Sequence, residues 1–304
     1  MNCPAPAKLN LFLHVTGRRA DGYHLLQTMF QMVDHGDLLH FTLRDDGQIR
    51  RVNDIAGVAE DTDLCVRAAR LLQTTIGARN ATSGSGNTSI SNSNSAPLGV
   101  DITLDKRLPL GGGLGGGSSD AATTLLALNH LWNAGLDRAA LLALGLQLGA
   151  DVPFFLFGQT AFAEGIGEAL TAVTLPPCWY VVIEPGVVVP TAAIFNSPHL
   201  TRNTKPVRIA DFSGAPFGFG KNDLQDVAVA LHAPIADAIA WLGQFGDARM
   251  TGSGACVFCP FHTSAQAEAA LVATQRHIAD GGLAWKAWTA AALMQHPLAY
   301  LPQS

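Results

Sequence analysis

The sequence predicts an α+β fold, because strand and helix patterns follow one another along the chain without a regular βαβ repeat. Two observations carry this prediction. The first third of the chain shows the two-residue periodicity of strands, and the later segments mix helical spacing with strand runs. The 304 residues are 48% hydrophobic and only 14% charged, which indicates a sizeable buried core rather than disorder.

The N-terminal third is expected to consist mainly of strands. Residues 7–15 (AKLNLFLHV) place their leucines and Val15 on one face, which predicts a half-buried strand. A second strand is expected over residues 25–33. We interpret residues 34–37 (DHGD) as a turn into a further strand, and residues 45–47 (DDG) as a hairpin turn.

Helical signals begin after this region. Residues 61–63 offer N-caps for a helix that reaches Ile76, and residues 77–96, rich in Ser, Asn and Gly, are expected to form a flexible surface loop. The remaining elements are expected in this order: a strand over 100–108, a helix over 118–133 ended by Gly135, a helix capped by Asp137 and ended by Gly149, short strands within 152–189, helices over 223–231 and 234–245, a strand–turn–strand over 249–260, a helix over 263–278 and a strand over 283–289.

Composition narrows the functional class. Five scattered cysteines, an odd number without framework spacing, are typical of a reducing compartment. Cys256 and Cys259 have C-x-x-C spacing, but no second pair completes a zinc site, so we interpret them as strand cysteines. No signal peptide or membrane span is evident, and a cytoplasmic protein is expected. The formal net charge of -5 argues against a general nucleic-acid binder.

The strongest functional signal is the stretch from Pro109 to Asp120 (PLGGGLGGGSSD), which holds six glycines interrupted only by Leu114. Such a run is entropically costly, so it needs a structural reason. It joins a strand to a helix, where several N–H groups can approach one anion and the helix N-terminus adds its positive dipole end. A flexible surface loop is the alternative. We expect a phosphate-binding loop formed by Pro109, Leu110, Gly111, Gly112, Gly113, Leu114, Gly115, Gly116, Gly117, Ser118 and Ser119.

Two commoner phosphate motifs do not fit this stretch. A Walker loop requires a lysine after its glycines, and no lysine follows here. Gly111, Gly113 and Gly116 satisfy G-x-G-x-x-G, and Asp137 lies about twenty residues further on, as a dinucleotide site requires. Asp137, however, is expected to open a helix, whereas the dinucleotide-binding acid ends a second parallel strand. The loop therefore indicates a phosphate site of another kind.

Three separated segments together resemble the motifs of the GHMP kinases, the family of galactokinase and of the homoserine, mevalonate and phosphomevalonate kinases. They are residues 6–11 (PAKLNL), the glycine-rich loop, and residues 251–255 (TGSGA). The segments LGADVPFF and AFAEGIGE extend the likeness over most of the chain. The likeness is closest to a family member whose acceptor carries a cytidine group.

The resemblance implies an ATP-dependent kinase that phosphorylates a small-molecule alcohol and releases ADP. It also implies two domains, an N-terminal one of ribosomal-protein-S5-like type over residues 1–160 and a ferredoxin-like one over residues 161–304. The active site would lie in the cleft between them. Magnesium would be delivered with the nucleotide, and the histidines show no spacing typical of a dedicated metal site. Ser118 or Asp151 could still touch the ion.

Lys8 and Asp151 receive catalytic roles only from the resemblance. Taken alone, Lys8 reads as an exposed strand lysine and Asp151 as a turn residue before a proline. The resemblance makes Asp151 the group that takes the proton of the acceptor hydroxyl, with Lys8 beside it. Phosphoryl transfer needs positioning, charge neutralisation and a proton acceptor. A nearby ammonium would keep the carboxyl group ionised and could help polarise the hydroxyl.

The resemblance also implies a cytidine pocket. Tyr23 and Phe195 would sandwich the cytosine ring, His24 would bond its edge, and Asn10 and Thr191 would hold polar groups of the substrate. Stacking contacts of this kind are worth roughly 1–3 kcal/mol each. Without the resemblance, Tyr23 would be interpreted as part of an ordinary turn, and Phe195 equally well as a buried core residue.

Other interpretations stay open at this point. Residues 251–255 form either a plain hairpin loop or, by the resemblance, a third motif that supports the substrate and glycine loops. Another GHMP kinase with a different acceptor is the alternative within the enzyme class. A non-catalytic protein that keeps the kinase fold to sense a ligand is the alternative outside it. A monomer or weak homodimer is expected, with no nucleic-acid or membrane partner.

Overall fold

The computed structural model describes residues 1–83 and 97–301. The helices are α1 (Leu64–Ser83), α2 (Gly116–Leu131), α3 (Arg138–Leu148), α4 (Val152–Phe157), α5 (Thr191–Asn196), α6 (Ile209–Ser213), α7 (Gln225–Leu231), α8 (Ala233–Leu242) and α9 (Ser264–Gly281). The strands are β1 (Asn2–Arg18), β2 (His24–Arg44), β3 (Ile49–Arg51), β4 (Gly99–Asp105), β5 (Ala161–Glu164), β6 (Ala169–Ala172), β7 (Trp179–Glu184), β8 (Arg249–Met250), β9 (Val257–Phe261) and β10 (Lys286–Leu293). The expected α+β class is confirmed.

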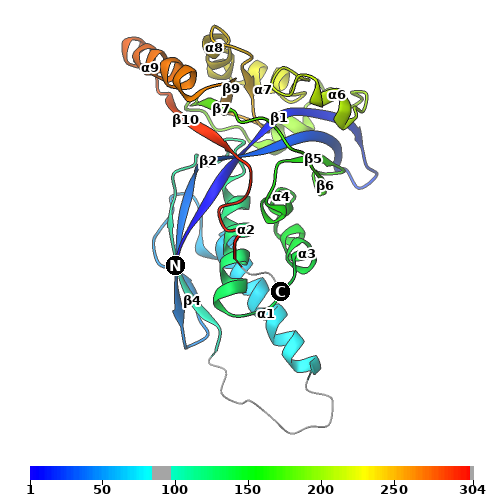
Figure 1. Cartoon of the computed structure of the whole chain (residues 1–304), viewed down its shortest axis with the longest axis vertical. Coiled ribbons are helices and arrows are strands. Elements are labelled where there is room, and N and C mark those ends of the chain that lie inside the picture. The colour runs from blue at the N-terminus through cyan, green and yellow to red at the C-terminus, as the bar shows by residue number, and fades with distance from the viewer. Residues whose placement is uncertain (84–96, 302–304) are drawn as a thin grey trace.

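The molecule is elongated, with α1 to α4 in the lower half of Figure 1 and α6 to α9 in the upper half. The long antiparallel strands β1 and β2 run from one half into the other. Neighbouring strands follow the order β3-β4-β2-β10-β7-β9-β8, with β1 and β5 also paired to β2. Hydrogen-bonded strands therefore connect the two halves, and the proposed division at residue 160 stays a prediction.

Buried side chains form three clusters. The first packs α1 to α4 against the N-terminal strands, and the second packs α7 to α9 against β7 and β9. The third lies between them and includes Leu9 and Leu11 of β1 together with Leu114 of the glycine-rich loop. The central cluster thus holds the start of the chain, the loop and the C-terminal strands in one packed unit.

The expectation that β1 is half-buried is wrong. The side chains of Lys8, Asn10, Phe12 and His14, on the face opposite the leucines, are all 6% exposed or less. Phe12 is covered by other aromatic rings, among them Phe212. Asn10 is buried there because Thr28 and Thr251, from other segments, form hydrogen bonds with it. No pattern within residues 7–15 can show such partners.

The expected turns of β2 also differ from the structure. Residues 34–37 do not end a strand, because β2 continues through them and the pairing with β1 shifts register between Ala7 and Pro6. Gly36 sits at this irregularity, where a Cβ atom would lie 2.0 Å from the carbonyl oxygen of Ala5. Residues 45–47 do not close a hairpin, since β4 lies between β2 and β3.

Further differences concern where helices begin and end and where additional helices form. Helix α1 runs to Ser83, so the expected loop is wrong for residues 77–83, and the rest of that loop lies outside the described residues. Helix α2 begins at Gly116, within the glycine run, and ends at Leu131. Residues 152–157 form helix α4 rather than a strand, with a proline in its first turn, where the missing N–H costs little. Helices α5 and α6 were not expected.

Two further expectations concern the whole chain. All five cysteines are free and buried. Cys259 lies in β9, as expected, whereas Cys256 lies just before this strand. Among the helices that the structure describes, none is long and apolar enough to cross a membrane.

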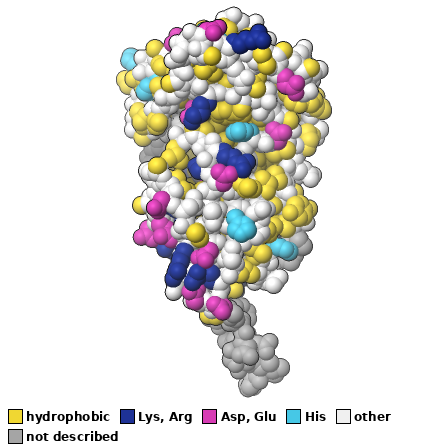
Figure 2. Space-filling model, turned by 90° about the vertical axis from the view of Figure 1, so that its left-hand side faces the viewer, with side chains coloured by type: hydrophobic (Ala, Val, Ile, Leu, Met, Phe, Trp, Pro, Cys, Tyr) yellow, Lys and Arg dark blue, Asp and Glu magenta, His cyan; other side chains and the backbone are white. Residues whose placement is uncertain are grey.

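On the face shown in Figure 2, Lys and Arg side chains lie beside Asp and Glu side chains, so charges of both signs are interspersed there.

Candidate active site

A cavity of about 800 Å³ lies where β1, β2, the glycine-rich loop and α5 meet. All of the predicted site residues line it except Leu114 and Ser119, which are buried beside it. The carbonyl oxygen of Leu114 accepts a hydrogen bond from the N–H of Lys8 at 2.9 Å. The loop is thereby fastened to β1 next to the predicted catalytic lysine.

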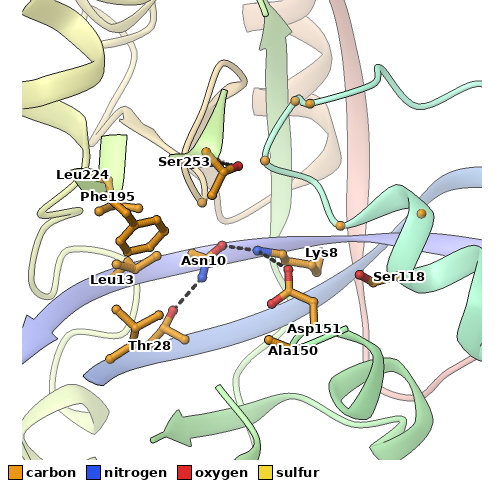
Figure 3. Close-up of a pocket in the computed structure, with 18 of the residues that line it drawn as sticks. Lys8, Asn10, Leu13, Thr28, Ser118, Ala150, Asp151, Phe195, Leu224 and Ser253 are labelled. Atoms are coloured by element: carbon orange, nitrogen blue, oxygen red, sulfur yellow. Dashed lines mark hydrogen bonds and ion pairs between the residues drawn. The ribbon is translucent and has the colours of Figure 1, made fainter. Parts of the chain in front are cut away.

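Lys8 and Asp151 meet in the middle of this cavity. The Nζ atom of Lys8 lies 3.6 Å from Oδ2 of Asp151, although 143 positions separate the two residues in the sequence (151 − 8). The Lys8 side chain is 4% exposed and that of Asp151 35% exposed, so the carboxyl group faces the open cavity (Figure 3). Burial lowers the pKa of Lys8, and the neighbouring Asp151 opposes that effect.

Asn10 orients the lysine. Its Oδ1 atom accepts a hydrogen bond from Lys8 Nζ at 2.5 Å, and its Nδ2 donates to Thr28 Oγ1 at 2.9 Å. The N–H of Asn10 donates to Thr251 Oγ1 at 2.9 Å. Residues 251–255 therefore support the centre of the site through this bond from Asn10 to Thr251, as the resemblance implied. Both polar atoms of the Asn10 side-chain amide thus take part in hydrogen bonds.

The glycine-rich loop leads into α2 without a side-chain cap. Gly115, the N-cap residue, has φ +70° and provides no side-chain hydrogen bond to the first turn. The N–H groups of that turn are therefore free to bind an anion, with the helix dipole favouring negative charge. The glycines also serve packing: a Cβ atom on Gly113 would lie 2.2 Å from the carbonyl oxygen of Thr251.

A buried charge network below the loop was missed by the sequence analysis. Lys106, which lines the cavity, donates from Nζ to Asp37 Oδ2 at 2.6 Å and to Asp120 Oδ2 at 2.8 Å. Asp37 Oδ1 also accepts hydrogen bonds from the N–H groups of Arg107 and Leu108, just before the loop. Asp37 thus anchors the start of the loop. No local pattern indicated this, because Asp37 lies in the irregular part of β2.

Within this network, the carboxyl group of Asp120 has an unusual pKa. Burial raises its pKa to about 8, and Lys106 opposes that effect. Its Oδ1 atom is buried and finds no hydrogen-bond partner among the described residues. One ammonium serving two buried carboxyl groups favours a state in which Asp120 keeps a proton.

The other end of the cavity brings the predicted cytidine-binding residues together. Tyr23 is 60% exposed at its rim. The ring centroids of His24 and Phe195 lie 5.0 Å apart, tilted by 33°. Phe195 belongs to α5 and faces the cavity in Figure 3, on the opposite side of Lys8 from Ser118. Sequence spacing could not show that a residue of α5 meets the start of β2.

One polar contact holds α5 and another holds His24. Thr191 and Ser253 share a hydrogen bond between their hydroxyl groups at 2.8 Å, which links α5 to the third motif. Arg202 donates from Nε to Nε2 of His24 at 3.1 Å. Burial lowers the pKa of His24, and the nearby Arg202 and Arg18 lower it further. Arg202 was not predicted, because neither its position nor its neighbours form a recognisable motif.

The same side chains bear on whether the site could hold a metal ion. Within residues 1–83 and 97–301, no group of three or more His, Cys, Asp or Glu side chains is arranged to hold a metal ion. Ser118 and Asp151 do line the same cavity, on the side of the glycine-rich loop. A metal ion that arrives with its own phosphate ligands would fit this arrangement.

Comparisons with known proteins agree with the geometry. Residues 63–159 match the model of the GHMP kinases N terminal domain, and residues 205–280 match that of the GHMP kinases C terminal. The 4-diphosphocytidyl-2-C-methyl-D-erythritol kinase of Janthinobacterium sp. (strain Marseille) is 64% identical over 303 residues, covering 100% of this chain and 98% of that protein. The protein of the same name from Herminiimonas arsenicoxydans is 65% identical over 300 residues, covering 99% and 97%.

Solved structures show the same relationship. A crystal structure of 4-(cytidine 5'-diphospho)-2C-methyl-D-erythritol kinase matches with a TM-score of 0.77 at 33% identity, covering 96% of this chain and 99% of that one. A homoserine kinase from Cytophaga hutchinsonii matches with a TM-score of 0.71 at 17% identity, covering 97% and 96%, and shares the fold. The chain therefore belongs to the 4-diphosphocytidyl-2-C-methyl-D-erythritol kinase family of the GHMP kinases.

Proposed function

We propose that this protein transfers the γ-phosphoryl group of ATP to the 2-hydroxyl of 4-diphosphocytidyl-2-C-methyl-D-erythritol and releases ADP, a step of the non-mevalonate route to isoprenoid precursors. One observation carries the proposal. Lys8 and Asp151 lie 3.6 Å apart in one cavity, between an uncapped helix start on one side and the His24–Phe195 ring pair on the other (Figure 3). A phosphate donor and a base-bearing acceptor can approach the pair from opposite ends.

The proposed chemistry places Asp151 as the proton acceptor. Its carboxyl group is partly exposed to the cavity, so a substrate hydroxyl can reach one oxygen while the other faces Lys8. As the hydroxyl oxygen bonds to the γ-phosphorus, its proton passes to Asp151 and the bond to the ADP oxygen breaks. The buried ammonium of Lys8, held by Asn10, stays beside the reacting oxygen and counters the negative charge that develops there.

The glycine-rich loop is the proposed phosphate site. Its backbone N–H groups and the first turn of α2 would bind the phosphates of ATP. Magnesium carried on those phosphates would neutralise part of their charge, with Ser118 and Asp151 as the protein side chains placed to touch it. A second hollow next to the loop shares Lys106 and Leu110 with the main cavity, and we assign it to the adenosine part of the nucleotide.

The acceptor end is the proposed cytidine site. Tyr23 and Phe195 would stack on the cytosine ring, His24 would bond its edge, and Asn10 and Thr191 would hold polar groups of the substrate. Support comes from the exposure of Tyr23 and from the placement of the other four side chains around the same cavity. Flat aromatic surfaces of this kind bind a base better than they bind a short branched alcohol.

Another GHMP kinase activity is the alternative that this end of the cavity argues against. Mevalonate and homoserine carry no ring to stack on Tyr23 or Phe195. Measuring kcat/KM with each of the three alcohols at fixed Mg²⁺ and ATP tests the assignment. The cytidine-bearing alcohol is expected to exceed the other two by a factor of at least about 10³, since two stacking contacts and an edge bond are lost without the base. Comparable values for mevalonate or homoserine would reject it.

Location and assembly complete the proposal. We propose a reducing compartment, the cytoplasm, because all five cysteines are free thiols. We also propose a monomer or weak homodimer without a nucleic-acid partner. Light scattering of the purified protein at several concentrations tests the oligomeric state.

A further inference from the structure

We propose that Arg202 is a positioning residue for the acceptor site, which sets the hydrogen-bonding capacity of His24 and the placement of Phe195. The identity of the ligand in this inference rests on the proposed function. The effect of Arg202 on His24 and Phe195 rests on the contacts alone. Arg202 is partly buried and does not line the cavity, so it acts through the residues that do.

The guanidinium group of Arg202 ties two distant segments together. Its Nε donates to Nε2 of His24 at 3.1 Å, across 178 positions in the sequence. Its Nη1 donates to the carbonyl oxygen of Leu200 at 3.0 Å. Its Nη2 donates to the carbonyl oxygens of Phe195 and Ser197, both at 2.8 Å. A planar fork of donors is suited to this set of four acceptors, whereas an ammonium is not.

The bond to His24 selects one form of the imidazole ring. A guanidinium group has donors only, so Nε2 of His24 must be the acceptor. In the neutral ring the proton then resides on Nδ1. The nearby charges of Arg202 and Arg18 and the partial burial of the ring all disfavour the imidazolium form.

This form of His24 has a consequence for recognition. With Nε2 engaged, the ring can donate one hydrogen bond through Nδ1 and has no free acceptor. It therefore suits a ligand edge that offers an acceptor, and cytosine offers two, O2 and N3. A ring free to change its protonation site would present either a donor or an acceptor, and would discriminate less between base edges.

The bonds to α5 fix the second feature. Helix α5 has only six residues, and the last carbonyl groups of a helix lack partners within it. Arg202 satisfies the carbonyl oxygens of Phe195 and Ser197 at this end. Since the Phe195 carbonyl is held, the backbone that carries the ring is held as well, at the 5.0 Å separation from His24. One side chain thus positions both the edge-bonding His24 and one of the two stacking rings, Phe195, of the proposed base site.

The first test needs no substrate. Protein labelled with ¹⁵N on histidine is prepared as wild type, Arg202→Met and Arg202→Lys, and a His24→Gln sample assigns the His24 resonances. Wild type is expected to show His24 in the Nδ1–H form. Arg202→Met is expected to shift His24 toward the Nε2–H form, because its Nε2 atom no longer accepts the bond. An unchanged His24 spectrum in Arg202→Met would overturn the inference.

The second test measures steady-state kinetics with the cytidine substrate and ATP. Arg202→Met is expected to raise the KM for the cytidine substrate about tenfold or more, with kcat and the KM for ATP changed less than about twofold. Arg202→Lys is expected to raise the same KM, since one ammonium cannot reach all four acceptors. Arg208→Met is the control, because that side chain is 87% exposed and pairs only loosely with Asp211.

The two tests separate the possible failures. An equal rise of both KM values in Arg202→Met would mean a general loss of structure and would contradict the inference. If Arg202→Met does not fold, the KM values of Arg202→Lys decide in its place, and an unchanged KM for the cytidine substrate would overturn the inference. If the wild type fails to phosphorylate the cytidine substrate, the proposed function is wrong, and the His24 spectrum still decides the role of Arg202.

Discussion

The glycine-rich end of the cleft is made from one contiguous stretch, residues 109–119, whereas the opposite end is assembled from two segments far apart in the sequence, residues 23–24 and residues 191–202. At the first end, backbone N–H groups are the proposed phosphate donors, and the glycines allow close approach. At the second end, side chains of both segments form the proposed base site, and Arg202 contacts His24 of β2 and the Phe195 carbonyl of α5. A phosphate can be bound by local geometry, but a base requires long-range placement.

This difference predicts that the two ends can be disabled separately. A change in the loop is expected to raise the KM for ATP, and a change at the aromatic end is expected to raise the KM for the acceptor. The Lys8–Asp151 pair lies between them and belongs to neither binding site alone. Its loss is expected to lower kcat and to leave both KM values nearly unchanged.

Asp151→Asn is expected to have the largest effect. Replacing the carboxyl group with an amide removes the proposed proton acceptor, and kcat is expected to fall by roughly 10²–10⁴. The side chain is 35% exposed and caps no helix, so the melting temperature should stay within a few degrees. Release of ADP with the cytidine substrate measures the effect. A near-normal kcat would remove Asp151 from its assigned role.

Tyr23→Ala tests the aromatic end. The loss of one stacking contact is expected to raise the KM for the cytidine substrate by roughly 10–100-fold, with the KM for ATP unchanged. Tyr300→Ala is the matched control, because that tyrosine is 74% exposed and does not line the cavity. An unchanged acceptor KM in Tyr23→Ala would leave the cytidine assignment without its main support.

Gly113→Ala tests the loop end. A methyl group there would lie 2.2 Å from the carbonyl oxygen of Thr251, at a residue with φ +76°. The loop must shift, and the KM for ATP is expected to rise about tenfold, with a loss of stability of about 2 kcal/mol. Gly77→Ala, inside α1 with nothing within 4 Å of the added carbon, should leave the KM for ATP unchanged and raise stability by about 0.5–1 kcal/mol. A larger effect of Gly113→Ala on the acceptor KM than on the ATP KM would contradict the separation of the two ends.

Asp120→Asn is expected to change the pH dependence of stability. In the folded protein the pKa of Asp120 is raised to about 8 by burial, above its ordinary value of 3.8. Between those values the folded form keeps a proton that the unfolded chain has released, so the free energy of unfolding of the wild type falls as the pH rises. Asparagine stays neutral at every pH and removes this fall.

Urea unfolding at pH 5, 7 and 8 measures the difference. Asp120→Asn is expected to be the more stable protein at pH 8 by about 1 kcal/mol or more, and the margin should shrink toward pH 5. The same slope in both proteins would show that Asp120 is ionised within the fold. That result would also change the charge assigned to the network below the loop.

The sequence predicted well what local patterns determine. The glycine-rich loop and the helix after it occupy the expected place, although α2 begins two residues earlier, at Gly116. The Asp137 cap of α3 is confirmed by the bond it accepts from Ala140. From local sequence alone, Lys8 would be an exposed strand lysine and Asp151 a turn residue. Only the resemblance to the GHMP kinases predicted that they act together in one site.

Long-range contacts account for what the sequence did not predict. Lys8 and Asn10 lie on the polar-looking face of β1, yet they are buried because Thr28 and Thr251 satisfy Asn10 from other elements. Arg202 bonds to a residue 178 positions away, and the Lys106 network joins β2 to α2. Periodicity and spacing describe one segment at a time, so such partners become visible only in the folded chain.

The central claim, that one cleft brings ATP and the cytidine-bearing alcohol to the Lys8–Asp151 pair, is tested most directly by ³¹P NMR of the reaction. The protein is mixed with Mg²⁺, ATP and 4-diphosphocytidyl-2-C-methyl-D-erythritol. One ADP and one new phosphomonoester on the 2-hydroxyl are expected per turnover, with the cytidine diphosphate linkage intact. ADP formation no faster than in a sample without the alcohol, or a phosphate on another hydroxyl, would contradict it.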